Sequence, residues 1–113
     1  MNVQIFGTKK SFDSKKAERY FKERGIKYQF VDMKEKGLSK GEFNSVCQAV
    51  GGYEKLIDPK CKDKNLLVLV QYLSEEDKKE KILENQKIIR TPIVRNGKQA
   101  TVGYEPDVWK DWK

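Results

Sequence analysis

Two short segments near the N-terminus have the alternating apolar and polar residues of β-strands. Residues 2–6 form the first, which Gly7 ends, and residues 26–33 (IKYQFVDM) form the second. Between them, apolar residues recur at helical spacing: Ala17, Tyr20 and Phe21. Two strands joined by a helix are expected to lie parallel with a right-handed crossover. The first 33 residues therefore predict a β-α-β unit.

Polar residues and a glycine are expected to set the ends of this helix. Asp13 or Ser14 is expected to be the N-cap, because either side chain can accept a bond from a free N–H of the first turn. Gly25 is expected to end the helix as its C′ residue. The polar loop 8–14 (TKKSFDS) then leads into the helix.

The middle of the chain is predicted to be largely helical. Ser39, with Glu42 three residues later, fits a capping box for a helix that Gly51 and Gly52 end. The buried stripe of this helix is Phe43, Val46, Cys47 and Val50. A short helical turn (53–57) and a charged loop (58–65, DPKCKDKN) follow.

The pattern leaves residues 66–73 open, because an apolar run of this length fits a strand or a helix. Ser74 then caps a clear helix with three acids in its first turn.

The last quarter of the chain predicts a hairpin and a final helix. Residues 88–95 (IIRTPIVR) are strand-like, and Pro92 places them at a sheet edge or a strand start. Asn96-Gly97 is a strong turn signal before the returning strand, 99–102. Residues 105–112 are expected to be helical, with three apolar residues on one face: Val108, Trp109 and Trp112. We interpret the two tryptophans as core anchors.

The predicted order is β-α-β-α-α-β-β-α, an α/β domain with a mixed sheet flanked by helices. Its 113 residues are near the usual size of one domain, so we expect a single domain over 1–113.

Composition excludes several kinds of site. The chain has no His and two Cys, which excludes histidine acid/base catalysis and argues against a zinc or haem site or a disulfide framework. The longest apolar run, 66–70, is far shorter than the roughly 20 residues of a membrane span. The N-terminus (MNVQIFGTKK) has no secretory signal pattern. We therefore expect a cytoplasmic protein without a membrane segment or a metal.

Positive charge is concentrated at the N-terminus. Residues 1–27 hold eight Lys or Arg and three Asp or Glu, a net +5 of the chain's +7. This excess favours an anionic partner, or it is only the solvated face of a helix. Nucleic acid is a weaker candidate, because four arginines stand against twenty lysines and no recognition motif is present.

Three segments carry a resemblance to a known family. They are residues 5–28 (IFGTKKSFDSKKAERYFKERGIKY), 88–94 (IIRTPIV) and 101–112 (TVGYEPDVWKDW). The chain resembles the ArsC-type arsenate reductase/Spx family. The resemblance implies a thioredoxin-like fold with a helical insertion and a cis Thr91–Pro92 bond, the alternative being a trans proline that starts an edge strand. It also implies that the Thr91 backbone faces the Ser11 loop.

The resemblance also implies a site at the start of the first helix. Ser11 falls where the family has its nucleophilic Cys, and Ser14 where Spx-like members have a second Cys. Lys60, Thr91 with neighbouring Arg90, and Tyr104 fall near the family's three oxyanion-binding arginines. We therefore interpret the following residues as an anion- or partner-binding site: Lys10, Ser11, Ser14, Lys15, Lys60, Arg90, Thr91 and Pro92. The simpler interpretation of Ser11 to Ser14 is helix capping alone.

Two functions remain open. Serine is not redox active and its hydroxyl stays protonated without a base, so the chain is expected to lack arsenate reductase activity. It would then be a monomeric binding or regulatory protein without a cofactor, whose partner is the RNA polymerase α subunit, as for Spx, or a small oxyanion.

The alternative is a glutathione-linked thiol oxidoreductase or arsenate reductase-like enzyme. Its nucleophile would be Cys61, which lies among lysines that favour the thiolate, or a native cysteine that Ser11 replaces.

Overall fold

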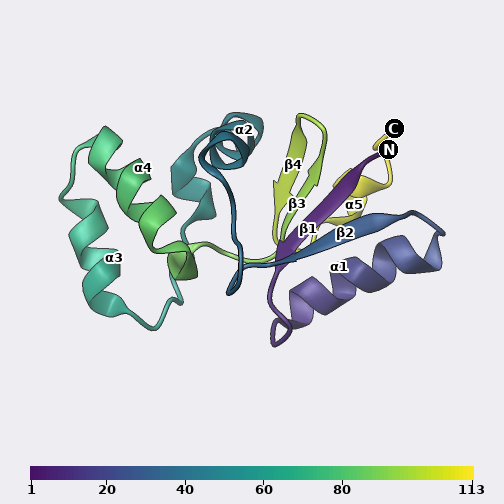
Figure 1. Ribbon diagram of the computed structural model, residues 1–113, viewed down its shortest axis with the longest axis horizontal. Coiled ribbons are helices and arrows are strands. Elements are labelled where there is room, and N and C mark those ends of the chain that lie inside the picture. The colour runs from purple at the N-terminus through teal and green to yellow at the C-terminus, as the bar shows by residue number, and fades with distance from the viewer.

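A four-stranded mixed sheet, in the order β2-β1-β3-β4, forms the centre of the computed structural model, which describes residues 1–113 (Figure 1). The strands are β1 (Val3–Gly7), β2 (Tyr28–Asp32), β3 (Ile93–Asn96) and β4 (Gln99–Val102). The α-helices are α1 (Phe12–Glu23), α2 (Lys40–Val50), α3 (Lys64–Gln71), α4 (Glu75–Glu84) and α5 (Pro106–Trp109). Two 3-10 helices, η1 (Tyr53–Leu56) and η2 (Gln86–Ile88), complete the chain.

The strand pairings confirm the predicted β-α-β unit. β1 and β2 are parallel, while β3 is antiparallel to both β1 and β4. Between β2 and β3 the chain inserts three α-helices, not the two of the predicted order. The α/β fold with a mixed thioredoxin-like sheet and a helical insertion is therefore confirmed, with one helix more than expected.

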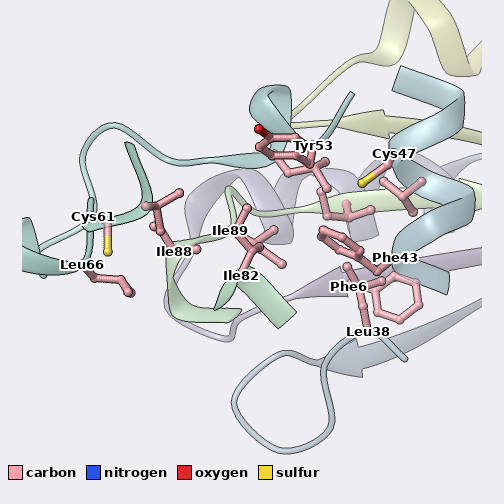
Figure 2. Close-up of a cluster of buried hydrophobic side chains, with 14 of the residues drawn as sticks. Phe6, Leu38, Phe43, Cys47, Tyr53, Cys61, Leu66, Ile82, Ile88 and Ile89 are labelled. Carbon is pink, nitrogen blue, oxygen red and sulfur yellow. The ribbon is translucent and has the colours of Figure 1, made fainter. Parts of the chain in front are cut away.

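Two apolar clusters hold helices on opposite faces of the sheet. One cluster joins β1 and β3 to α1 and to the tryptophans of the C-terminal segment: Val3, Ile5, Ala17, Tyr20, Phe21, Val94, Trp109 and Trp112. The other joins Phe6, Val31 and Ile93 to the three inserted helices, α2, α3 and α4 (Figure 2). The two tryptophans are buried, as expected, and the indole N–H of Trp109 donates to the Thr101 hydroxyl at 2.8 Å.

The structure corrects the predicted cap of α1. Ser11 is the N-cap, and its hydroxyl accepts from the backbone N–H of Ser14 at 3.2 Å. Asp13 and Ser14 lie inside the first turn instead. The Ser14 side chain is fully buried and its hydroxyl accepts from the Thr8 N–H, so a contact outside the helix occupies it. Gly25 follows the helix with φ +66°, as expected of a C′ glycine.

Most other local predictions are confirmed. The Ser39/Glu42 capping box forms, Gly51 is left-handed at the end of α2, and Ser74 caps α4. The open segment 66–73 is mainly helical, because it packs as α3 against α4.

Two predicted elements at the C-terminal end are shorter than expected. β3 begins at Ile93, directly after Pro92, while Ile88 ends a 3-10 turn and Ile89 makes an isolated bridge with Ile57. The final helix covers only Pro106–Trp109, and Val108 is 43% exposed instead of buried. None of the helices has the length and apolar character needed to cross a bilayer.

Candidate functional site

A cavity of about 440 Å³ lies where the start of α1 meets the loop before β3. Its lining comes from three separate segments of the chain: Ser11 and Asp13; Ile57, Asp58, Pro59 and Lys60; Arg90 and Thr91. The Thr91–Pro92 bond beside it is cis, as expected. We call these eight residues the Ser11 pocket. Ser11 and Thr91 line it together, as the resemblance implied.

The start of α1 presents unpaired backbone donors at this pocket. The N–H groups of Phe12 and Asp13 have no partner in the chain, whereas that of Ser14 bonds to the Ser11 hydroxyl. Free N–H groups and the positive end of the helix dipole together favour an anionic group. The same capping bond holds the hydroxyl of Ser11, which is one of the lining residues.

Two cations line the pocket and are positioned by backbone contacts. The Arg90 N–H donates to the Leu56 carbonyl at 2.7 Å. The Arg90 guanidinium lies against Gly103, where a Cβ would be 3.2 Å from its nitrogen. Lys60 sits in a turn, and its N–H donates to the Asp58 carboxylate at 2.9 Å. Both side chains are exposed and free of ion pairs, so their charge is available to a ligand.

Two carboxylates, Asp13 and Asp58, offset these two cations. The lining has no net formal charge, although the surrounding N-terminal segment is strongly positive. A free oxyanion would meet both carboxylates as well as the cations. The pocket is therefore better suited to a ligand that carries both an anionic group and hydrogen-bond donors than to an isolated oxyanion.

The sequence profile of the ArsC family matches residues 6–112. The chain belongs to the ArsC family. It is 27% identical to the global transcriptional regulator Spx 2 of Oceanobacillus iheyensis, with all of the chain and 94% of that relative aligned.

Solved structures share the fold over nearly the whole chain. An ArsC family related protein from Bacteroides fragilis has a TM-score of 0.86 at 19% identity, covering 100% of this chain and 98% of that one. Arsenate reductase from Vibrio cholerae has a TM-score of 0.82 at 25% identity, covering 96% and 94%. The proteins that resemble this chain therefore include a transcriptional regulator and an arsenate reductase.

The structure places some predicted site residues of this ArsC family chain outside the pocket. Ser14 is fully buried and cannot touch a ligand, which corrects its assignment. Lys10 and Lys15 are exposed nearby but do not line the cavity. Pro92 is buried and does not line the cavity, although the neighbouring Thr91 does.

Neither cysteine reaches the Ser11 pocket. Cys61 is 8% exposed, and its thiol donates to the Lys87 carbonyl at 3.8 Å. Cys47 is equally buried, and burial raises the pKa of its thiol, with Lys79 opposing the rise. Figure 2 shows the two sulfurs within the same apolar cluster, Cys61 beside Leu66 and Cys47 on α2. Their burial favours core packing over thiol chemistry.

Two residues of this site do not follow from the sequence pattern. The first is Asp58, which the pattern places only in a charged loop, although Asp before Pro is a turn signal. Its carboxylate accepts from the Lys60 N–H and so shapes the turn that holds Lys60. The second is Phe12, which is 80% exposed between the pocket residues Ser11 and Asp13. Tyr104, expected near a third oxyanion contact, packs edge-on against Trp109 at 5.5 Å and does not line the pocket.

Proposed function

We propose that the protein is a binding or regulatory member of the ArsC family without arsenate reductase activity, and that it recognises a protein partner at the Ser11 pocket. The observation that carries the proposal is the lining of this pocket, which contains a serine hydroxyl at the helix start and no thiol. Arsenate reduction needs a thiolate to attack arsenic and to be regenerated by another thiol. The hydroxyl of Ser11 has no histidine base and no redox chemistry.

Two features favour a protein partner over a small oxyanion. The lining of the pocket is neutral overall, which weakens its attraction for a free anion. The adjacent Phe12 is 80% exposed, and an aromatic anchor of this kind is typical of protein interfaces. Lysines surround it on the loop and on α1: Lys9, Lys10, Lys15 and Lys16.

The RNA polymerase α subunit is the partner to test first, because of the resemblance to Spx. We expect the purified α subunit to bind, and we expect Phe12→Ala to weaken binding by about tenfold or more, as for a buried aromatic anchor. Val108→Ala is the control, since Val108 is 43% exposed on α5, outside both the Ser11 pocket and the insertion. Equal effects of both variants, or no binding by the wild type, would reject this partner.

The absence of reductase activity has its own test. Arsenate-dependent oxidation of NADPH is measured with glutathione and glutaredoxin, and separately with thioredoxin. The expected rate equals that of a heat-treated sample. Turnover above that control would overturn the proposal, and its loss in Cys61→Ser would identify Cys61 as the nucleophile.

A further inference from the structure

Helix α3 is apolar on both of its sides. Leu66 and Val70 face the core and are buried. Three large apolar residues face outward and are 53%, 45% and 81% exposed: Val68, Leu69 and Tyr72. We call these three residues the α3 outer face. They lie on the helical insertion, at one end of the molecule's 43 Å long axis, with α4 packed on the inner side of α3 (Figure 1).

The fold does not account for this outer face. A helix on the surface of a domain normally has polar residues on its solvent side, and a helix that is apolar all round is normally covered on all sides. The outward residues are spaced i, i+1 and i+4, so they lie on one side of two turns of helix. The core cluster uses the opposite side of α3. An exposed apolar patch that the packing of the fold does not use is a candidate interaction surface.

Charges of opposite sign stand at the two ends of the α3 outer face. Lys62 and Lys64 are exposed at the N-terminal end of α3. Glu76 is exposed just beyond its C-terminal end, at the start of α4. None of these three side chains forms an ion pair within the chain.

We propose that two copies of this chain associate through their α3 outer faces, with the two α3 helices antiparallel about a two-fold axis. In a two-fold interface the same patch serves both copies, so the patch must be complementary to itself. An antiparallel arrangement sets the lysine end of each helix against the glutamate end of the other. It also aligns the two helix dipoles favourably. This self-complementarity distinguishes a second copy from an unrelated partner.

The association is weak because the surface is small. Two turns of helix from each copy bury less than the roughly 1,200 Å² of a standard stable interface. We therefore expect a dissociation constant in the micromolar range or above, so that the expected monomer prevails in dilute solution. The dimer forms as the concentration rises.

Sedimentation equilibrium at concentrations from about 5 to 500 μM tests the proposal. The average mass of the wild type should rise toward that of a dimer. Tyr72→Ser and Val68→Ser should each raise the dissociation constant at least tenfold. Circular dichroism checks that these variants remain folded. A wild type that stays monomeric throughout, or a dimer that neither variant weakens, overturns the proposal.

A charge exchange tests the antiparallel arrangement independently of the apolar contacts. Lys64→Glu and Glu76→Lys should each weaken association about threefold or more, and the double variant should recover the wild-type value. Lys98→Glu makes the same charge change in the β3–β4 turn and should have no effect. Failure of the double variant to recover association, with a normal Lys98→Glu control, rejects the antiparallel dimer.

Discussion

The side chain of Ser14 lies directly against the backbone of Gly7, at the point where β1 ends. A Cβ at Gly7 would lie 2.8 Å from the Ser14 Cβ and closer still to the Ser14 hydroxyl. The same hydroxyl accepts from the Thr8 N–H at 3.3 Å. The contact packs the first turn of α1 against the end of β1. It thereby fixes the position of Ser11 at the pocket.

Gly7→Ala should destabilise the protein by about 1–3 kcal/mol, as is usual when a methyl group is forced into a packed site. The free energy of unfolding is measured by urea denaturation. Ser14→Gly removes the opposing side chain and is itself destabilising. The double variant should therefore be more stable than the sum of the two single effects predicts. Strict additivity would show that the two residues do not clash.

Ser11→Cys should create a thiol with a pKa below the free value of about 8.5, because the free N–H groups of α1, Lys60 and Arg90 favour the thiolate. Asp13 and Asp58 oppose the effect, so the decrease should be modest. The pKa is obtained from the rate of alkylation by iodoacetamide as a function of pH. The buried Cys47 should react more slowly at pH 7.

Ser74→Cys is the matched control for that experiment. Ser74 also caps a helix and accepts from the Asp77 N–H, but three acids occupy its first turn: Glu75, Glu76 and Asp77. The thiol introduced there should have a higher pKa than the one introduced by Ser11→Cys. The reverse order would mean that the Ser11 pocket is not electropositive at the helix start.

Gln86→Leu should destabilise the protein by about 2–4 kcal/mol. The Gln86 amide accepts from the Leu38 N–H at 2.7 Å and donates to the Leu38 carbonyl at 2.8 Å. Leu38 is 4% exposed, so the variant leaves two buried backbone groups unpaired, at about 1–3 kcal/mol each. Gln86→Glu keeps the acceptor but sets a carboxylate oxygen against the Leu38 carbonyl, so it should also destabilise the protein in urea denaturation at neutral pH. A Gln86→Glu variant as stable as the wild type would argue against the bond to the Leu38 carbonyl.

Asp63 should make stability depend on pH in the acid range. Its bond from Lys87, at 2.9 Å, and its bond from the Leu66 N–H lower its pKa. A lowered pKa means that this stabilisation is present above the ordinary value of about 3.9 and is lost as pH falls through the lowered value. The urea midpoints of wild type and Asp63→Asn should therefore differ at pH 7 and converge as pH falls through the lowered pKa of Asp63. A difference that is constant with pH would show that the charge of Asp63 is not involved.

Lys87, the partner of Asp63, should act at the other end of the pH range. Its pKa is raised by the same contact, so its contribution is present below the ordinary lysine value of about 10.4 and is lost as pH rises through the raised value. Lys87→Gln should lower the urea midpoint at neutral pH, as Asp63→Asn does. The double variant should add little to either single change, because the two side chains act as one pair.

The sequence by itself determined the features that depend on neighbouring residues. Ser39 with Glu42, Ser74 with its acidic first turn, and Gly51 each satisfy a helix end through bonds within one or two turns. The Asn96-Gly97 turn and the first β-α-β unit likewise depend on local pattern. The family resemblance of residues 88–94 added the cis Thr91–Pro92 bond, which no local pattern indicates.

Tertiary structure alone decided the features that depend on distant contacts. The pattern of residues 66–73 fits a strand or a helix, and packing against α4 favours the helix. The residue type of Ser14 allows it to cap α1, but its side chain is buried against Gly7. The cap is Ser11 instead, whose hydroxyl accepts from the Ser14 N–H. The Ser11 pocket joins segments about 45 and 80 residues apart along the chain, and Asp58 entered it only through folding. Its neutral lining follows from that assembly, because charges brought together from separate segments cannot be summed from local sequence.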